Sequence, residues 1–362
     1  MSVPRSVTGP CMRIVVTGAS GNVGSALVER LGREDQVESI VGISRRPHDW
    51  RPDRTEWVHL DLSRDVADDL ATALRGADAV VHLAWLFQPT RHPEVTWRAN
   101  VIGTTRVLDA VERAGVPAVV VASSVGVYSP RAGLDLVDES WPSHGVPLTA
   151  YSREKAYVER LLDAHEARHP DRRVVRIRPA FIFQARAATQ QRRLFMGPLV
   201  PHALLRSTIP VVPMPADLRL QTLHTSDVAE AYTAAVTREV RGAFNLAAEP
   251  VLGPEELARL LGGRWVPAPA RAMRAGLAAA WAAHAVPASP QLFDLLMSAP
   301  MMSAQRAREQ LDWSPRVSAP DALRAFLDGL AGDSDVPTPP LADRTSGPAR
   351  AHEVATGVGE RP

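Results

Sequence analysis

The sequence is poor in cysteine and contains no long apolar run. Cys11 is the only cysteine in 362 residues, which excludes an intramolecular disulfide and any cysteine-based metal cluster and suits a reducing compartment. The eleven histidines are scattered without the spacing of metal ligands, so we predict no metal site. No apolar run approaches the ~20 residues of a membrane span, and residues 1–10 lack the apolar core of a signal peptide. We therefore expect a cytoplasmic protein that does not enter a membrane.

The chain also lacks an excess of charge of either sign. Its 41 basic and 40 acidic side chains leave a formal net charge of +1. This balance gives no reason to expect binding to nucleic acid or to an anionic membrane surface. A length of 362 residues is enough to bury a full α/β core and to add a second lobe.

Lysine is almost absent, because Lys155 is the only lysine among the 41 basic residues. A chain that uses arginine everywhere else suggests that position 155 needs a compact ammonium, which reaches places where a planar guanidinium does not fit. Tyr151 lies four residues earlier, so on a helix the two side chains share one face, about 5–6 Å apart at Cβ. An ammonium near the phenol lowers the pKa of Tyr151 from about 10 and favours its use as a general acid/base. The same spacing occurs on ordinary helix surfaces, so the rest of the chain has to decide.

A glycine-rich loop near the N-terminus has the context of a dinucleotide-binding fingerprint. Residues 13–17 form a β-branched run that predicts a buried strand, and residues 25–31 have the apolar periodicity of a helix. Between them, the first glycine permits a tight turn, the second lets the backbone approach a pyrophosphate, and the third lets the helix pack on the strand. The residues that we assign to this site are Gly18, Gly21, Asn22, Val23 and Gly24.

Two arginines follow the second predicted strand, residues 39–44. An acidic residue about 20 positions after the last glycine would bind a bare ribose 2′-hydroxyl. Arg45 and Arg46 stand there instead, and two guanidiniums suit a 2′-phosphate better. We therefore predict a preference for NADP(H), with NAD(H) possible and a solvated basic turn as the alternative interpretation.

The remaining pattern alternates strands with helices. We expect strands at 58–62, 77–84, 118–124 and 173–179, a long helix at 93–112, and further strands at 220–224 and 242–247. This alternation predicts an α/β fold with a doubly wound parallel sheet of the Rossmann type. His82, in the fourth strand, is expected to be a packed histidine rather than a catalyst.

A series of motifs appears in the order found in one family. They are Thr17-Gly-x-x-Gly-x-x-Gly24, Asp61-Leu62, His82-Leu83-Ala84, Asn100-x-x-Gly103-Thr104, Ser123-Ser124 before Val127-Tyr128, Tyr151-x-x-x-Lys155, Arg178-Pro179 and His224-x-x-Asp227-Val-Ala229. Over roughly residues 12–330 the chain resembles the extended short-chain dehydrogenases/reductases, the NAD-dependent epimerase/dehydratase family. The resemblance implies that Tyr151 is the general acid/base, that Lys155 holds the nicotinamide ribose, and that Ser124 hydrogen-bonds the reacting oxygen.

The resemblance assigns further residues less sharply. Asn100 is either a fourth catalytic residue or an interior polar contact of its helix, and both readings stay open. Asp61 is placed to meet the adenine. The other expected cofactor contacts are Leu62, Leu83, Ala84 and Pro179.

The domain organisation follows from the same resemblance. We expect a flexible N-terminus at 1–11, a nucleotide-binding domain at 12–180 that is rejoined by about 218–248, and a smaller α/β substrate lobe from 181–217 and 249–330. Residues 331–362 have the composition of a disordered tail. The family also leads us to expect a homodimer, formed through the helices at 100–112 and 150–165.

Departures from the family pattern narrow the activity. The stretch Ser124-Val125-Gly126 replaces the Thr-Asp-Glu of sugar-nucleotide dehydratases, so no acid remains there for elimination of water. Sugar-nucleotide epimerases usually carry Asn soon after Arg-Pro, where this chain has residues 180–184, Ala-Phe-Ile-Phe-Gln. Trp85 and Phe87 place aromatic bulk near the expected substrate mouth. We therefore favour an NADP(H)-linked carbonyl reductase or alcohol dehydrogenase acting on a moderately apolar substrate.

Two other functions stay open. One is an NAD-dependent nucleotide-sugar epimerase, which would keep its cofactor through each turnover. The other is a non-catalytic NADP-sensing regulator on the same fold. Regulators of that kind lack the tyrosine–lysine pair, so the presence of Tyr151 and Lys155 argues against this last reading.

Overall fold

The computed structural model of the chain describes residues 11–88, 91–196, 210–331 and 338–341. The N-terminal segment that we predicted to be flexible lies outside these residues except for Cys11, and so does most of the predicted disordered tail. Within that tail, Thr338 and Leu341 are buried, and Leu341 packs against Ala187. This short segment is therefore packed on the protein, where composition alone had predicted disorder.

The centre of the molecule is a seven-stranded sheet in the order β11-β7-β5-β4-β1-β2-β3, and every pair of neighbouring strands is parallel. The order reverses at β1, which separates β2 and β3 from the later strands. Parallel neighbours joined by helices give a doubly wound α/β fold, which confirms the predicted fold class. The strands are β1 Met12–Thr17, β2 Val37–Ser44, β3 Thr55–His59, β4 Ala79–His82, β5 Ala118–Ala122, β7 Arg173–Pro179 and β11 Gly242–Leu246.

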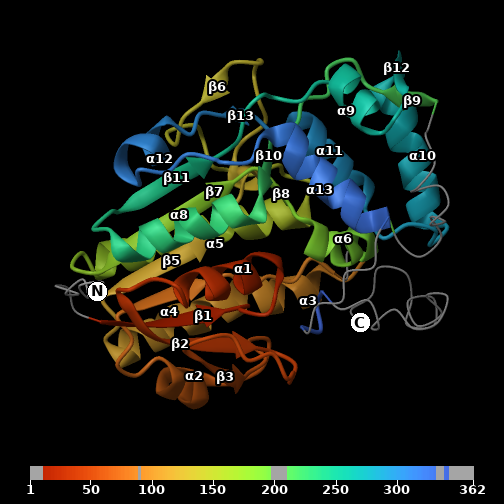
Figure 1. Cartoon of the computed structure of the whole chain (residues 1–362). Helices are drawn as coiled ribbons and strands as arrows, with labels where there is room; N and C mark the ends of the chain where they lie inside the picture. The colour runs from red at the N-terminus through yellow and green to blue at the C-terminus, as the bar shows by residue number, and fades with distance from the viewer. Residues whose placement is uncertain (1–10, 89–90, 197–209, 332–337, 342–362) are drawn as a thin grey trace.

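Helices cover both faces of the sheet (Figure 1). Helices α1 (Asn22–Leu31) and α8 (Thr225–Thr237) pack into one apolar core, while α2 (Ala67–Ala73), α4 (Gly103–Ala114) and α5 (Ala150–Arg168) pack into the other. The β1 side chains alternate between the two cores, so that neighbouring apolar residues serve opposite faces. A strand buried on both faces reads as a continuous apolar run, which is why the sequence predicted these strands well.

The rest of the described chain forms small elements outside this sheet. Figure 1 shows α9, α10, β9 and β12 grouped together at its upper right. Three two-stranded parallel sheets pair β10 with β8, β12 with β9, and β13 with β6. Their bounds are β6 Leu136–Val137, β8 Phe181–Phe183, β9 Val211–Met214, β10 Thr222–His224, β12 Arg264–Pro267 and β13 Met301–Met302, with helices α6 Ala188–Phe195, α9 Pro254–Leu260, α10 Ala270–Ala282, α11 Pro290–Ser298, α12 Gln305–Gln310 and α13 Ala319–Ala331.

Two expected strands differ from the structure. The strand at 220–224, which we expected to rejoin the central sheet, is β10 and pairs with β8 instead; only β11 takes the position beside β7. The strand predicted at 58–62 is β3 and ends at His59, so Asp61 lies in the turn that follows. In both cases an apolar run located a strand but could not specify its partner or its end.

The long helix predicted at 93–112 is divided into three parts. These are α3 (Pro93–Trp97), a π-helical turn at Arg98–Ile102, and α4. Asn100 sits in the middle of the π-helical turn. Such turns are frequent at functional sites because they redirect a side chain out of the regular helical register.

Candidate active site

The glycine loop between β1 and α1 is closely packed. Gly18 has a φ of +71°, and a Cβ added there would lie 2.7 Å from the Ala84 nitrogen. A Cβ at Gly24 would lie 2.2 Å from the Gly18 oxygen. Any larger residue at either position would push β1, α1 or the end of β4 apart, so the loop needs glycine for both its turn and its packing.

The N-terminus of α1 is open to an anion. Gly21 precedes the helix in an extended conformation, and no side chain caps the helix. The first-turn N–H groups of Asn22, Val23 and Gly24 therefore remain available, and the helix dipole favours negative charge there. This uncapped end fits the pyrophosphate of a dinucleotide.

The Asn22 side chain braces this loop. Its Oδ1 accepts hydrogen bonds from Gln184 Nε2 at 2.7 Å and from Thr225 Oγ1 at 3.0 Å. Val23 packs against the core on the α1 side of the sheet. Nothing in the sequence indicated the contacts of Gln184 and Thr225 with Asn22. Both residues lie far from position 22 in the chain, and neither belongs to a local motif that links it to the glycine loop.

Arg45 and Arg46 follow β2 at the carboxyl edge of the sheet, and both are partly buried. Burial lowers the pKa of Arg45, and the nearby Asp61 carboxylate opposes that shift. Burial and the charges of Arg45 and Arg193 lower the pKa of Arg46 to about 10. Within the described ranges, neither Arg45 nor Arg46 has a hydrogen bond or a salt bridge. Arg193, from α6, adds a third guanidinium that no sequence motif indicated.

The turns after β3 and β4 approach the same edge. Asp61 Oδ1 accepts hydrogen bonds from the backbone and the hydroxyl of Ser63. The Leu62 oxygen accepts from Arg106 Nη1 at 2.8 Å. The Leu83 nitrogen donates to the Thr17 oxygen at 3.0 Å, which draws Leu83 and Ala84 against the glycine loop.

Two further residues of this edge are buried. His82 bridges the hydroxyls of Thr17 and Thr104 at 2.7 and 2.9 Å. Because His82 is buried, the packed histidine that the sequence predicted is confirmed. Burial and the charge of Lys155 lower the pKa of His82 to about 3. Pro179 is buried at the end of β7.

Tyr151 and Ser124 lie close together around Gly126: a Cβ built at Gly126 would be 2.8 Å from Tyr151 Cε1 and 3.4 Å from Ser124 Oγ. Ser124 Oγ accepts a hydrogen bond from the Gly126 nitrogen at 3.0 Å. The Tyr151 ring stacks on Phe87, with 4.6 Å between centroids and 18° between planes, and meets the edge of Trp85 at 5.9 Å. Position 126 must be glycine for the phenol to keep this place, because a Cβ there would collide with the ring.

The expected influence of Lys155 on Tyr151 is not what the structure shows. Burial raises the pKa of Tyr151 to about 12, while the nearby Ser124 hydroxyl opposes the shift and the Glu154 charge adds to it. The prediction that an adjacent ammonium lowers this pKa is therefore wrong. Helical spacing predicts the shared face correctly but not the direction in which the lysine side chain extends.

Lys155 Nζ extends toward β5 and the loop after β4. It donates to the Ala122 oxygen at 2.6 Å, lies 3.4 Å from the centroid of the Trp85 ring, and is 6.0 Å from the Tyr151 ring. Burial lowers the pKa of Lys155 to about 7, against the opposing charges of Glu154 and Glu159. A cation placed on a ring face gains about 0.5–2 kcal/mol, which favours the charged form of the lysine.

Asn100 lies beside this pair but does not contact Tyr151. Its Oδ1 accepts from the Leu86 nitrogen at 2.7 Å, and its Nδ2 donates to the Leu86 oxygen at 2.8 Å and to Glu154 Oε2 at 2.7 Å. Thr96 Oγ1 donates to the other Glu154 oxygen at 2.6 Å. Glu154 gave no signal in the sequence except that it precedes Lys155.

A buried ionic network fixes the helix that carries Tyr151 and Lys155. Glu159 accepts from Ser123 Oγ at 2.6 Å and from two Arg178 nitrogens at 2.9 Å, and it pairs with Arg176 at 3.1 Å. Burial alone would raise the pKa of Glu159, but Arg178 and Ser123 lower it to about 2. Because Ser123 is next to Ser124, the network ties α5 to the ends of β5 and β7 beside the candidate site.

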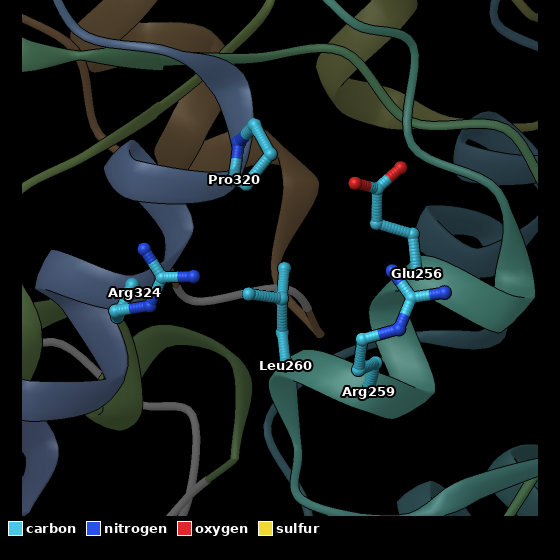
Figure 2. Close-up of a pocket in the computed structure, with 5 residues that line it drawn as sticks. All are labelled: Glu256, Arg259, Leu260, Pro320 and Arg324. Atoms are coloured by element: carbon cyan, nitrogen blue, oxygen red, sulfur yellow. The ribbon is translucent and has the colours of Figure 1, made fainter.

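A separate pocket of about 180 Å³ opens between α9 and α13. Figure 2 shows Glu256, Arg259 and Leu260 of α9 facing Pro320 and Arg324 of α13 across it. It contains none of the residues assigned above. Among the described residues no group of three or more histidine, cysteine or acidic side chains could hold a metal, and no described helix is long and apolar enough to cross a membrane.

Comparison with known proteins agrees with this geometry. The sequence model of the NAD dependent epimerase/dehydratase family matches residues 14–247. An uncharacterized protein of Mycobacterium tuberculosis is 28% identical over 324 residues, 89% of this chain. The chain spans only 30% of the length of that relative.

Two further matches have named activities. A putative dihydroflavonol 4-reductase of Synechocystis is 33% identical over 149 residues, 40% of this chain and 42% of the relative. Among solved structures, the UDP-glucose 4-epimerase of Thermotoga maritima, determined with UDP-glucose, covers 88% of this chain and 98% of its own at 16% identity, with a TM-score of 0.66. At that identity the likeness is one of fold.

Proposed function

Because the chain belongs to the NAD-dependent epimerase/dehydratase family, we propose that it is an NADP(H)-linked carbonyl reductase or alcohol dehydrogenase. The observation that supports this choice is the aromatic wall around the candidate acid. Phe87 stacks on Tyr151, and Trp85 covers its edge and Lys155. Such a wall suits an apolar substrate better than a hydroxyl-rich sugar, whose polar groups would lose hydrogen bonds against it.

The residues present fit a nicotinamide dinucleotide. The uncapped α1 end and the closely packed glycine loop fit a pyrophosphate. The guanidiniums at the end of β2 fit a 2′-phosphate, which favours NADP(H) over NAD(H). Lys155 lies next to the site and would hold the nicotinamide ribose once its bond to Ala122 is exchanged. A bound nicotinamide supplies or accepts the hydride.

The side chains then move the proton. In reduction, the Tyr151 hydroxyl donates its proton to the substrate oxygen as that oxygen becomes negative, and in oxidation it takes the proton back. Ser124, whose hydroxyl lies near the Tyr151 ring, holds the same oxygen. The pKa of about 12 keeps Tyr151 protonated in the free protein, which is the form that reduction needs. Once Lys155 has exchanged its bond to the Ala122 oxygen, its charge stabilises the phenolate that is left behind.

The competing reading is an NAD-dependent nucleotide-sugar epimerase. The fold likeness to a UDP-glucose 4-epimerase supports it, whereas the partial match to a putative dihydroflavonol 4-reductase supports the reductase. A regulator that only senses NADP would have no use for Tyr151 and Ser124 placed close together.

A cofactor-release assay separates these functions. The purified protein is denatured, and released nicotinamide is quantified before the native protein is tested on a panel of carbonyls and sugar nucleotides. The reductase predicts little retained cofactor and net NADPH oxidation with carbonyls. The epimerase predicts nearly one retained cofactor per chain and no net oxidation. The regulator predicts NADPH binding without turnover of either class.

We also propose that the protein forms a homodimer through the helices that the sequence indicated. Trp97, Ile102 and Tyr157 are 37%, 38% and 46% exposed, and the rings of Trp97 and Tyr157 lie 4.9 Å apart. Exposed apolar side chains grouped in this way mark interaction surfaces. Sedimentation of the native chain and of Trp97→Glu checks this, since the dimer predicts that the charge yields monomers.

A further inference from the structure

The segment after β4 carries two aromatic side chains, and a single amide holds its centre. Leu86 lies between Trp85 and Phe87, and both of its backbone polar groups bind the side chain of Asn100, at 2.7 and 2.8 Å. Two hydrogen bonds from one planar amide fix the orientation of a peptide more closely than one bond would. The positions of Trp85 and Phe87 therefore depend on Asn100.

Those two rings cover Tyr151 and Lys155, which we call the candidate dyad. Trp85 places its face 3.4 Å from Lys155 Nζ, and Phe87 stacks on Tyr151 with 4.6 Å between centroids. Phe87 also meets Phe195 of α6 edge to face at 5.9 Å. The same short segment therefore contacts the Lys155 ammonium through Trp85 and the Tyr151 ring through Phe87.

Glu154 fixes the orientation of the Asn100 amide. Its buried carboxylate accepts from Asn100 Nδ2 at 2.7 Å and from Thr96 Oγ1 at 2.6 Å. A carboxylate only accepts hydrogen bonds, so the NH₂ group of Asn100 must face it. The amide oxygen is then left to accept from the Leu86 N–H. Because Glu154 lies between Tyr151 and Lys155 on α5, it connects the dyad helix to the aromatic segment.

We propose that Asn100 and Glu154 are positioning residues, which hold Trp85 over the Lys155 ammonium and Phe87 over the Tyr151 ring, so that Phe87 forms the wall against which a flat, apolar carbonyl substrate packs. The part of this inference that concerns the substrate rests on the proposed function. The part that concerns Lys155 does not, because it describes the protein without substrate.

The surroundings of Lys155 define what releasing Trp85 would do. Glu154 and Glu159 of α5 face it with negative charge, and Tyr151 of the same helix is protonated. His82 of β4 is neutral, with a pKa of about 3. The Ala122 oxygen and the Trp85 ring are its remaining contacts. Removing Trp85 takes away one stabilising contact of the ammonium, so the pKa of Lys155 should fall below about 7.

A single lysine makes this measurable directly. Because Lys155 is the only lysine, lysine carrying ¹³C at the ε position gives one resonance, whose shift with pH reports its titration. The native chain is compared with Asn100→Ala, Trp85→Leu, the double variant, and Glu154→Gln. The control is Thr105→Ala. The Thr105 hydroxyl donates to the Val101 oxygen one helical turn earlier, and it does not contact Leu86 or Glu154 through a hydrogen bond.

The inference predicts a specific pattern. Asn100→Ala and Trp85→Leu should each lower the midpoint by about one pH unit, the double variant should lower it no further, and the control should match the native chain. Glu154→Gln should also lower it, since both the charge and the amide orientation change. An unchanged midpoint in Asn100→Ala, or additive shifts in the double variant, would overturn the proposal. If Asn100→Ala does not fold, Asn100→Ser takes its place with the same expected direction.

The substrate part has its own readout. In a chain that turns over carbonyls, Phe87→Leu and Asn100→Ala should raise KM about tenfold for a planar aromatic ketone, with a smaller change in kcat and no change in KM for a small aliphatic ketone. Equal effects on both ketones would overturn the substrate wall. If the native chain reduces no carbonyl, the proposed function fails, while the Lys155 titration still decides the positioning role.

Discussion

Replacing Arg45 and Arg46 by glutamine should reduce the preference for NADPH over NADH by about 30-fold. A charge-assisted hydrogen bond contributes about 1.5–3 kcal/mol when buried. Both guanidiniums are only partly buried and are therefore screened, so about 1 kcal/mol each is the better figure. Two such contacts give about 2 kcal/mol, which corresponds to the 30-fold change.

Two features of the site bear on that magnitude in opposite directions. The three clustered guanidiniums repel one another. Burial is the largest cause of the lowered pKa of Arg46, about 10, and the charges of Arg45 and Arg193 lower it further. A bound phosphate would relieve this repulsion. Arg193 stays in the double variant, however, and would keep part of the preference. We therefore expect NADPH affinity to fall strongly but not to the level of NADH.

The assay is a fluorescence titration of both cofactors at fixed ionic strength. Arg51→Gln is the matched control, because Arg51 lies on the same loop but is exposed and bonds the His48 and Trp50 carbonyls. Its affinity ratio should equal that of the native chain. If the double variant also keeps the native ratio, the arginines form only a solvated basic turn. A native chain that prefers NADH would refute the phosphate site and favour the epimerase.

Four further variants test the site and its support. Tyr151→Phe should lower turnover by about 10²–10⁴-fold with cofactor affinity nearly intact, and Ser124→Ala should be milder, as steady-state kinetics and a binding titration will show. Gly126→Ala should displace the phenol, since its Cβ would lie 2.8 Å from the Tyr151 ring. The free energy of unfolding in urea should fall by about 1–3 kcal/mol. An unaltered kcat would contradict the displacement of the phenol. Glu159→Gln should cost about 3–5 kcal/mol by leaving Arg178 buried without its charged partner. Because the pKa of Glu159 is lowered from 4.5 to about 2 by Arg178 against burial, the native chain should lose that stability as the pH falls through this range, and the variant should not.

The sequence predicted the parts of the molecule that depend on local pattern. Apolar runs located the strands of the central sheet, and the spacing of Gly18, Gly21 and Gly24 located the loop that the structure shows to be closely packed. Both follow from short-range rules, because a buried parallel strand and a strand–glycine–helix turn have signatures within about ten residues. The pairing of β10 with β8 has no such signature.

The chemistry of the site depended on contacts between distant residues. Tyr151 and Lys155 share a helix, but whether the ammonium faces the phenol is decided by Trp85 and by the Ala122 carbonyl, which come from other elements. Burial then raises the pKa of one and lowers that of the other. Asn100 could be recognised from its motif, yet its partners Leu86 and Glu154 emerged only in three dimensions.

Transfer of deuterium from NADPH labelled at C4 of the nicotinamide tests the central claim most directly. The native chain and Tyr151→Phe are incubated with the labelled cofactor and a planar aromatic ketone, and the product alcohol is analysed by mass spectrometry and NMR. We expect the native chain to place one deuterium on the carbinol carbon for each NADP⁺ released, and the Tyr151→Phe variant to do so at least about 100-fold more slowly. Absence of deuterium from the alcohol formed from every carbonyl tested, together with interconversion of a sugar nucleotide on a cofactor that never leaves the protein, would contradict the account.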